Sequence, residues 1–456
     1  MSETLYTSKK TLKNYANGGN VLILATFLAL LIVNLPFCTK FYNSLWTHEI
    51  ALQVGKFNLF SHHGHPMSIM AFINDALMAV FFFSIGLEIK REILVGELSS
   101  FRQALLPIVA AVGGMGVPVL VFFIIGHGSD YMDGAAIPMA TDIAFSLGVL
   151  SMLGNRVPVS LKIFLTTLAV VDDIGGILVI AIFYSSHISY IMLLIAAGLL
   201  AILALGGRFG IQSKIFYLGI GAFVWFLFLN AGIHPTIAGV LIAFCVPAKP
   251  VYAPKKYIRT IRENIGKFEQ EDDELLVSKT ILRKDQMSWL KEIESASDKV
   301  ISPLQDMEDS LHPVVNYIIV PLFAFANAGI YFGDLEISSI FKGVSIAIIA
   351  GLVLGKFAGI LFFSWLTVKL KWAPMPEGCN WKQLASVALL GGIGFTVSLF
   401  IANLSFGTGD PALSQILNNA KLGILVGSLL AGVGGWLALH FTLPKAKDEE
   451  KVTETS

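Results

Sequence analysis

The chain has 456 residues, of which 55% are hydrophobic and only 14% are charged. It contains 32 Lys and Arg residues against 32 Asp and Glu residues, so no basic excess points to a nucleic-acid partner. Apolar runs long enough to cross a bilayer recur along most of the chain, which excludes a single soluble core and indicates a polytopic membrane protein. The three cysteines, Cys38, Cys245 and Cys379, are too far apart for a metal or redox motif.

About twelve apolar runs predict membrane-spanning helices. They lie at about residues 19–37, 73–94, 105–125, 135–153, 159–184, 190–205, 216–229, 236–247, 313–332, 344–370, 384–404 and 422–441. We therefore divide the chain into an N-terminal segment 1–18, spans 1–8 in 19–247, a charged loop 248–311, spans 9–12 in 312–441 and a tail 442–456.

The basic residues give the orientation of these spans. The connections 126–134, 185–189 and 230–235 contain neither Lys nor Arg, whereas the alternate connections contain them. Because Lys and Arg accumulate in cytoplasmic loops, we expect the N-terminal segment, the 248–311 loop and the tail to be cytoplasmic.

The 248–311 loop breaks the apolar pattern. It is dense in charge of both signs, and Ile258, Ile261 and Ile265 recur at helical spacing. A solvated, partly helical cytoplasmic connection is the favoured interpretation, and a regulatory or partner-binding segment is the alternative.

Two spans carry helix breakers. Pro138 precedes Thr141-Asp142 in the fourth span, and the eleventh contains Gly391-Gly392-Ile393-Gly394. Interrupted helices are tolerated in a membrane only where the freed backbone groups line a cavity or meet protein partners. Two such helices in separate halves of the chain predict a secondary transporter. We expect an all-α fold of about twelve transmembrane helices, with inverted repeats and two interrupted helices that cross near the membrane centre.

Four ionisable residues lie deep within the predicted spans: Asp142, Asp172, Asp173 and Lys356. An aspartate at the centre of a membrane helix costs about 2.5–3.5 kcal/mol on insertion scales, so two adjacent aspartates there indicate a functional role. A buried structural pair neutralised by a basic partner is one interpretation, and an ion or proton site is the other. Three acids against one base suit a hard cation such as Na⁺ or Li⁺, with the Thr141 hydroxyl as a further oxygen ligand.

Asp172 and Asp173 cannot have the same partner. Adjacent residues diverge by about 100° around a helix, so one plausible division places Asp173 at the ion cavity and Asp172 against Lys356. Protons and a cation would then compete for the same carboxylate oxygens. That competition is a physical basis for antiport.

The second predicted span ends in a charged cluster. Glu88 and Glu92 are one helical turn apart, with Arg91 three residues from Glu88. The cluster is either a salt-bridged helix end or a cation funnel and pH-responsive region.

Other polar residues in or near the spans have plainer interpretations. We expect Asp75 to be mainly structural and His234 to cap a helix or stabilise an interface. His62, His63 and His65 lack a nearby Cys or carboxylate, which argues against a metal site. No nucleophile triad, phosphate loop or cofactor motif is present, so we expect neither enzyme chemistry nor a cofactor.

Several long motifs resemble the NhaA-type bacterial sodium/proton antiporters, and the resemblance extends from the first span to the last. The motifs occur in order at residues 74–82, 137–145, 161–173, 321–329 and 391–396. The resemblance implies a twelve-span inner-membrane protein that exchanges Na⁺ or Li⁺ for a larger number of protons. It also implies electrogenic transport, activation at alkaline pH, a homodimer and a role in salt tolerance.

The resemblance also assigns residues. Asp172 and Asp173 match the family's aspartate pair that binds cation and protons, Lys356 its lysine partner, and Thr141-Asp142 its broken-helix residues. Glu88, Arg91 and Glu92 match the pH-responsive region, with Glu308 at a further pH-response position. The outer loop 38–70 matches the region of dimer contacts.

The sequence departs from the best-known members at two places. The 248–311 loop is far longer here, and Asp309 stands where some members have histidine. The expected function is a Na⁺(Li⁺)/H⁺ antiporter that works by alternating access. The alternatives are a sodium- or proton-coupled solute symporter and a non-transporting membrane ion sensor.

Overall fold

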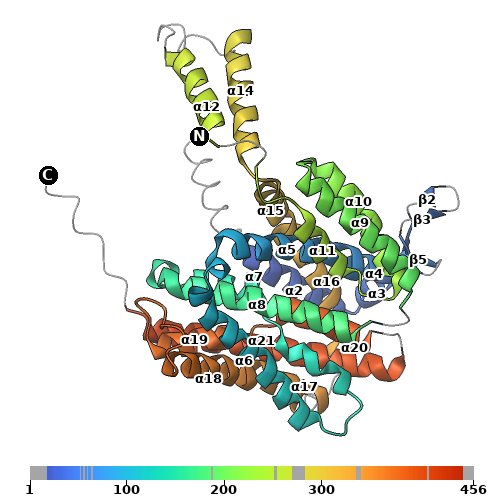
Figure 1. The fold of residues 1–456 in the computed structure, drawn as a ribbon. Helices are drawn as coiled ribbons and strands as arrows, with labels where there is room; N and C mark the ends of the chain where they lie inside the picture. Colours follow the sequence, from blue (N-terminus) through green and yellow to red (C-terminus); the bar gives the residue numbers. More distant parts are fainter. Residues whose placement is uncertain are drawn as a thin grey trace, which may run out of the picture.

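The computed structural model describes residues 18–444, except residues 52, 55–56, 59, 63–64, 186–187, 251–253, 270–282, 335–339 and 408–409. Nearly all of the predicted N-terminal segment, most of the tail and most of the acidic part of the 248–311 loop therefore lie outside the described residues. The rest is almost entirely helical, as predicted, and Figure 1 shows the helices packed side by side in one bundle.

Each predicted apolar run contains a helix. Six of them form mostly regular helices: α2 Gly18–Asn34, α6 Phe101–Gly126, α8 Val159–Phe183, α9 Tyr190–Arg208, α10 Lys214–Ala231 and α21 Pro411–Thr442. Three contain a π-helical turn. The first consists of α4 Ile69–Ala71, the π-turn η1 Phe72–Leu77 and α5 Met78–Val95, and the second of α15 Pro303–Val314, the π-turn η5 Val315–Ile319 and α16 Val320–Asn327. The third consists of α17 Gly343–Ala350, the π-turn η8 Gly351–Gly355 and α18 Lys356–Lys369. Two are interrupted: the 3-10 helix η3 Met132–Met139 with α7 Ile143–Ser151, and α19 Trp381–Leu390 with α20 Phe395–Phe406. The last is the short apolar helix α11 Thr236–Cys245.

The helix lengths agree with a polytopic membrane protein. Within the described ranges, nine helices are long and apolar enough to cross a membrane, or up to eleven when each of two bent helix pairs is one span. The short helix α11, of ten residues, occupies the eighth predicted run. The ninth predicted span begins at 312, but its helix already begins at Pro303, where Ser302 accepts a hydrogen bond from the Gln305 amide as its N-cap.

The two interrupted helices meet at their breaks, as predicted. The Asp142 amide donates to the Ile393 carbonyl oxygen at 2.6 Å. The Thr141 hydroxyl lies 2.9 Å from the Gly391 carbonyl oxygen, and the Ser146 hydroxyl donates to that of Leu390. Backbone groups freed by one break are therefore satisfied by the other, as an apolar environment requires.

Helices α6 and α18 touch through glycine. A Cβ atom on Gly359 would lie 2.1 Å from the Gly113 carbonyl oxygen, and one on Gly113 would lie 2.5 Å from that of Gly359. Lys356 lies three residues before Gly359 on the same helix. This close approach therefore fixes how deep Lys356 lies in the bundle and the direction in which its side chain points. Small residues allow such contacts between membrane helices.

The connections form two structures outside the bundle. After α2 the chain bends by 114° into α3 Thr39–Thr47, and the outer loop then forms short antiparallel strands. They are β1 Glu49–Ile50, β2 Gln53–Val54, β3 Phe57–Asn58, β4 Ser61–His62 and β5 His65–Ser68. The 248–311 loop contains α12 Pro254–Glu269 and α14 Lys284–Val300, which project together from the bundle (Figure 1).

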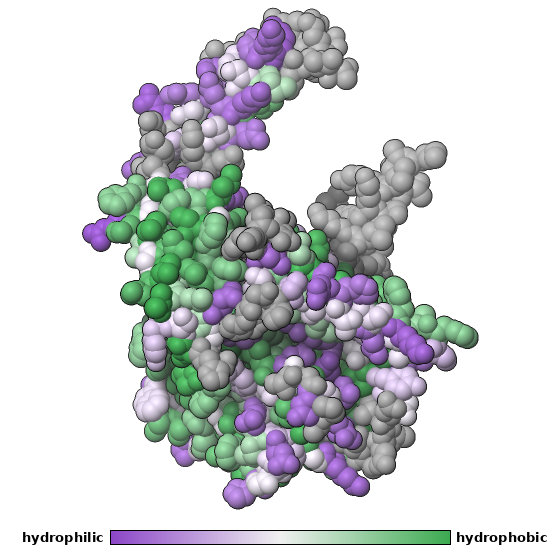
Figure 2. Space-filling model, turned by 90° about the vertical axis from the view of Figure 1, so that its right-hand side faces the viewer, coloured by the Kyte–Doolittle hydropathy of each residue, from purple (hydrophilic) through white to green (hydrophobic). Residues whose placement is uncertain are grey.

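The surface colouring separates these parts. Figure 2 shows a largely hydrophilic surface on the α12–α14 hairpin and broad hydrophobic areas on the bundle. This contrast is expected if the bundle faces lipid and the hairpin faces water. The partly helical connection predicted for 248–311 is therefore present in the described residues.

A branched side chain at Gly359 should separate α18 from α6. We expect Gly359→Val to lower the unfolding free energy by about 1–3 kcal/mol or more, because overpacking forces the helices apart. Gly116→Val is the matched control, since a Cβ at Gly116 on α6 meets nothing within 4 Å. Thermal unfolding of the detergent-purified variants measures the difference, and equal stability of the two variants would contradict the proposed contact.

Candidate ion-binding site

A buried ion pair lies beside the two helix breaks. The Lys356 ammonium group contacts Asp172 Oδ2, and both side chains are fully buried. Lys356 Nζ also donates to the Thr141 hydroxyl at 2.8 Å, and that hydroxyl lies 2.6 Å from Asp172 Oδ2. The fourth, fifth and tenth spans therefore meet at this pair, because Thr141 follows η3, Asp172 lies on α8 and Lys356 begins α18.

Asp142 links the two helix breaks through hydrogen bonds. Its carboxyl group accepts hydrogen bonds from the Phe145 amide at 3.0 Å and from the Thr396 amide and hydroxyl at 3.0 and 2.6 Å. Asp142 is thus the N-cap of α7 and also holds the first turn of α20. Its oxygens already have three donors.

Asp173 is placed differently from its neighbour. It is 4% exposed and lines a cavity of about 370 Å³, whereas Asp172 is outside that lining. Among the described residues no group donates a hydrogen bond to Asp173. Helix geometry predicts this division, with one carboxylate at the lysine and the other at the cavity. Asp173 is therefore the carboxyl group whose oxygens are open to an arriving proton or cation.

The cavity extends from Asp173 along the second span. Thr141, Asp142 and Thr396 line it near the breaks, and Ser84 and Glu88 of α5 line it further along. Oxygen atoms thus follow one another along the cavity, which is the ligand type that hard cations prefer. No group of three or more His, Cys, Asp or Glu side chains arranged to hold a metal occurs in the part of the chain that the structure describes.

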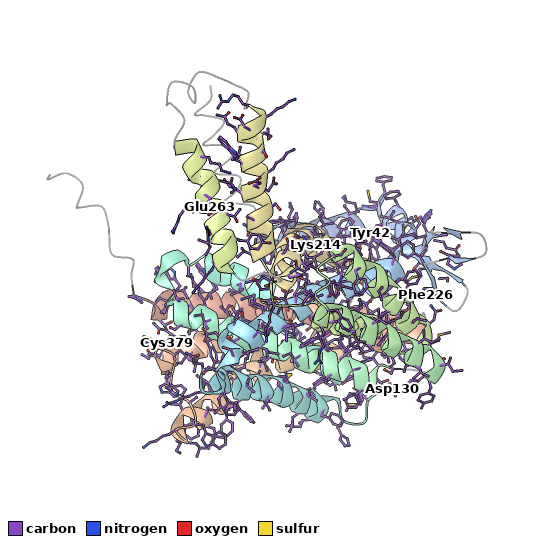
Figure 3. All side chains as sticks on the ribbon, turned by 45° about the horizontal axis from the view of Figure 1, so that its top comes forward. Tyr42, Asp130, Lys214, Phe226, Glu263 and Cys379 are labelled. Carbon is purple, nitrogen blue, oxygen red and sulfur yellow. The ribbon has the colours of Figure 1, made fainter. Side chains whose placement is uncertain are left out.

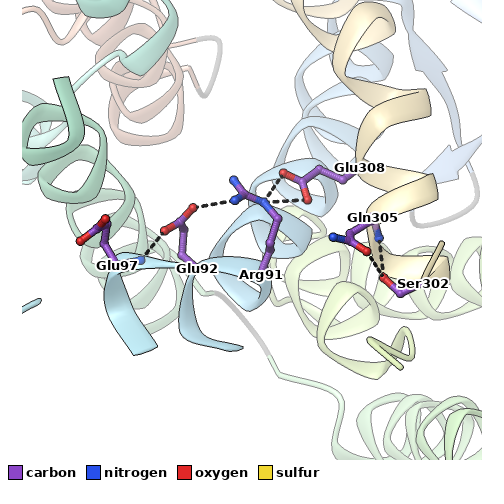
Figure 4. Close-up of polar contacts among 6 residues, drawn as sticks. All are labelled: Arg91, Glu92, Glu97, Ser302, Gln305 and Glu308. Atoms are coloured by element: carbon purple, nitrogen blue, oxygen red, sulfur yellow. Dashed lines mark hydrogen bonds and ion pairs between the residues drawn. The ribbon is translucent and has the colours of Figure 1, made fainter. Parts of the chain in front are cut away.

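Of the predicted pH-response residues Glu88 lines this cavity, and Arg91 forms ion pairs with Glu92 and Glu308. Arg91 Nη1 lies 2.9 Å from Glu92 Oε1, and Arg91 Nε lies 2.9 Å from Glu308 Oε1 (Figure 4). Glu88 lies one turn before Glu92 and faces the cavity. The cluster therefore joins α5 to α15 across a long separation in sequence.

The outer polar residues make structural contacts. His234 Nδ1 lies 2.8 Å from the Thr236 hydroxyl and accepts from the Thr236 amide, so it caps α11, as expected. Its Nε2 lies 3.6 Å from Asp75 Oδ1, and the Asp75 carbonyl oxygen accepts from the Trp225 indole. Of the three outer histidines, His63 and the side chains of His62 and His65 lie outside the described residues. The three cysteines are free.

Thr396 and Lys421 are buried polar residues that the sequence pattern does not single out. Thr396 was part of a recognised motif, but its two hydrogen bonds to Asp142 depend on the meeting of two distant breaks. Lys421 is 8% exposed on α21. It escaped notice because the twelfth span was predicted to begin one residue later, whereas the helix begins at Pro411.

The ion pair gives a stability prediction. We expect Asp172→Asn or Lys356→Met alone to lower the unfolding free energy by about 3–5 kcal/mol, because each leaves one buried charge without its partner. The double variant should lose less unfolding free energy than either single variant. The exposed pair between Lys214 and Asp306, 2.7 Å apart, supplies the control, since Lys214→Met should change stability by less than about 1 kcal/mol. Figure 3 labels Lys214.

Thermal and denaturant unfolding of the four purified proteins complete this double-mutant cycle. Strictly additive losses would contradict coupling between Asp172 and Lys356.

Comparison with known proteins agrees with this architecture. The family described as Na⁺/H⁺ antiporter 1 matches residues 9–439. The Na(+)/H(+) antiporter NhaA of Phocaeicola vulgatus is 57% identical over 440 residues, covering 96% of each chain. The protein of the same name from Bacteroides fragilis is 53% identical over 446 residues, covering 97% of this chain and 100% of the relative. That of Porphyromonas gingivalis is 48% identical over 427 residues, covering 94% of each. The chain therefore belongs to the Na⁺/H⁺ antiporter 1 family.

Proposed function

We propose that this protein is an electrogenic antiporter that exports Na⁺ or Li⁺ in exchange for protons. The observation that carries the proposal is the open carboxyl group of Asp173 at the cavity, directly beside the buried pair of Asp172 and Lys356. The family membership and the printed names of the relatives support the same activity.

Competition for Asp173 couples the two ions. A carboxylate binds either a proton or a cation, so each arriving ion displaces the other from the same oxygens. Asp173 and Asp172 bind the cation and protons, Thr141 and Asp142 contribute further oxygens, and Lys356 holds Asp172 while the site is empty. Alternating access then carries the cation outward and returns protons inward.

Unequal charge movement makes the exchange electrogenic. If more protons than cations cross in each cycle, net positive charge moves inward, and each elementary charge gains about 2.3 kcal/mol per 100 mV of membrane potential. The potential alone could then drive sodium export. This property separates electrogenic exchange from a one-for-one exchange.

The cluster of Glu88, Arg91, Glu92 and Glu308 is the proposed pH-response region. It stands at the cavity and ties α5 to α15, so protonation there would change how these helices pack. Loss of the charged contact at lower pH would favour the inactive form, and the contact would favour the active form at alkaline pH.

The proposed location is the inner membrane of a bacterium with both termini in the cytoplasm, which the basic connections support. We also propose a homodimer with contacts through the outer loop 38–70. The described part of this loop folds into short antiparallel strands, in the orders β1-β5-β4 and β2-β3, and the edges of small sheets can add strands from a second chain. Light scattering of the purified protein distinguishes the dimer from a monomer.

Asp173→Asn tests the central proposal. In everted vesicles, Na⁺ or Li⁺ should collapse a preformed pH gradient with the wild type, and the variant should lose at least about a hundredfold in rate, because an amide cannot exchange a proton for a cation. Asp130→Asn is the control, since Asp130 is an exposed carboxylate in the connection after α6 (Figure 3). Both variants should reach the membrane in equal amounts.

The same vesicles separate the alternatives. Exchange that survives in Asp173→Asn would place the cation elsewhere. Sodium flux that requires an added organic solute would indicate a symporter, and sodium binding without flux would indicate a sensor. A transient membrane potential that appears with exchange would support electrogenic transport, and its absence would contradict it.

Glu308→Gln tests the pH-response region. The glutamine removes the charged contact with Arg91 that would favour the active form, so we expect about fivefold slower exchange at pH 8.5, as an interaction on the order of 1 kcal/mol would give, and little change at pH 6.5, where the inactive form already predominates. Asp306→Asn is the matched control on the same helix, because its ion pair with Lys214 is exposed. Parallel pH profiles of Glu308→Gln and wild type would contradict the assignment.

A further inference from the structure

Three of the helices that line the cavity also contact one another away from its lining residues. They are α5 with its preceding turn η1, α16 and α20, which contribute Ile85, Val320 and Val397 to the lining. The basic residues Lys90 and Arg91 place the Glu88 end of the cavity toward the cytoplasm, so the continuation of these helices away from Glu88 leads toward the outer surface. Contacts among these three helices on that side can therefore help to close the pathway.

Each of the three helices carries a phenylalanine within three residues of a lining residue but outside the lining itself. The rings of Phe82 and Phe400 have centroids 5.6 Å apart, and those of Phe323 and Phe400 are 6.3 Å apart. All three side chains are at most 2% exposed. Together they form an apolar layer above the binding residues.

Beyond this layer each helix carries an asparagine, and the three asparagines form one chain. The Asn403 carboxamide nitrogen donates to Asn327 Oδ1 at 2.9 Å, and the Asn327 nitrogen donates to Asn74 Oδ1 at 2.9 Å. Asn327 is fully buried in the middle, with its nitrogen also donating to the Phe323 carbonyl oxygen. We call Asn74, Asn327 and Asn403 the asparagine chain.

The order of residues is the same on all three helices. Moving away from the cavity, α16 presents Val320, Phe323 and Asn327. Helix α20 presents Val397, Phe400 and Asn403 in the same direction along the chain. Helix α5 and η1 run in the opposite direction along the chain. Moving away from the cavity, they present Phe82 first and then Asn74. Three segments that are distant in sequence therefore build the same two layers.

We propose that the asparagine chain is the latch of the outer gate. Its two hydrogen bonds link the second, ninth and eleventh spans on the outer side, away from the Glu88 end of the cavity. An outward-facing state needs these spans to separate, so the latch must break once in every transport cycle. The proposal rests on the alternating access described under the proposed function. Because carboxamides carry no charge at any physiological pH, the latch holds equally well in the acid and alkaline states.

Cysteine labelling tests the latch directly. Met78 is 1% exposed and lies one helical turn from Asn74 on the cavity side. In a background where the three native cysteines are serine, Met78→Cys reports the opening of the outer pathway to a membrane-impermeant maleimide added outside intact cells. We expect slow labelling when the asparagine chain is complete.

Breaking the latch should speed this labelling. Asn327→Leu preserves the approximate shape and removes both links, and we expect labelling at least about fivefold faster. Asn403→Leu is a second, less buried variant and should also accelerate labelling. Because both variants break the same chain, the double variant should be no faster than Asn327→Leu.

Asn34→Leu is the matched control. Asn34 also links two segments distant in sequence, because its nitrogen donates to the Ile330 carbonyl oxygen and its oxygen accepts from the Phe332 amide, both in the connection after α16. It lies on α2, outside the lining of the cavity. Labelling of Met78→Cys should be unchanged by this substitution.

The outcomes are decisive in both directions. Unchanged labelling in Asn327→Leu and Asn403→Leu would overturn the latch, and so would equal acceleration by Asn34→Leu. Sodium/proton exchange of the same variants is measured separately. Faster labelling in the latch variants, when the Met78→Cys parent itself shows no exchange, would retain the latch and reject the proposed function, whereas normal exchange of the parent with unchanged labelling in the variants would do the reverse.

Discussion

A lysine ammonium group buried among membrane-spanning helices depends on the carboxylate beside it. Transfer of a single charge into an apolar interior is so costly that Lys356, which is fully buried, requires the contact with Asp172. The Thr141 hydroxyl completes this arrangement and belongs to one of the two helix breaks. The close approach of α6 and α18 and the meeting of the breaks both serve to bring these groups together.

The adjacent aspartates divide two tasks that one residue could not perform. Asp172 is held by lysine and threonine, which fixes a negative charge at a defined place. Asp173 faces the cavity without a donor among the described residues. Two adjacent residues of one helix thus have different surroundings, a paired one for Asp172 and a cavity for Asp173.

The parts of this arrangement that are local in sequence could be predicted, and the parts that depend on distant contacts could not. The opposite facing of Asp172 and Asp173 follows from helix geometry, and the breaks follow from Pro138 and the glycines near Gly391. The contact of Arg91 with Glu308 spans 217 positions, so only the family resemblance pointed to Glu308. The asparagine chain joins three segments, none of which has an unusual local pattern. Lys421 was missed because hydropathy places the ends of spans only approximately.

The π-helical turns have a consequence for how the sequence is aligned with the structure. Such a turn contains one residue more than an α-helical turn, so a helical wheel drawn continuously from α17 into α18 is wrong by about 100° after η8. The chain could lose one residue between Gly351 and Gly355 by converting this turn to α-helix, which would leave Lys356 and Gly359 facing their partners. The loss of one residue between Lys356 and Gly359 would instead rotate the glycine out of its contact with α6. Sequence spacing at this site is therefore strict on one side of Lys356 and adjustable on the other.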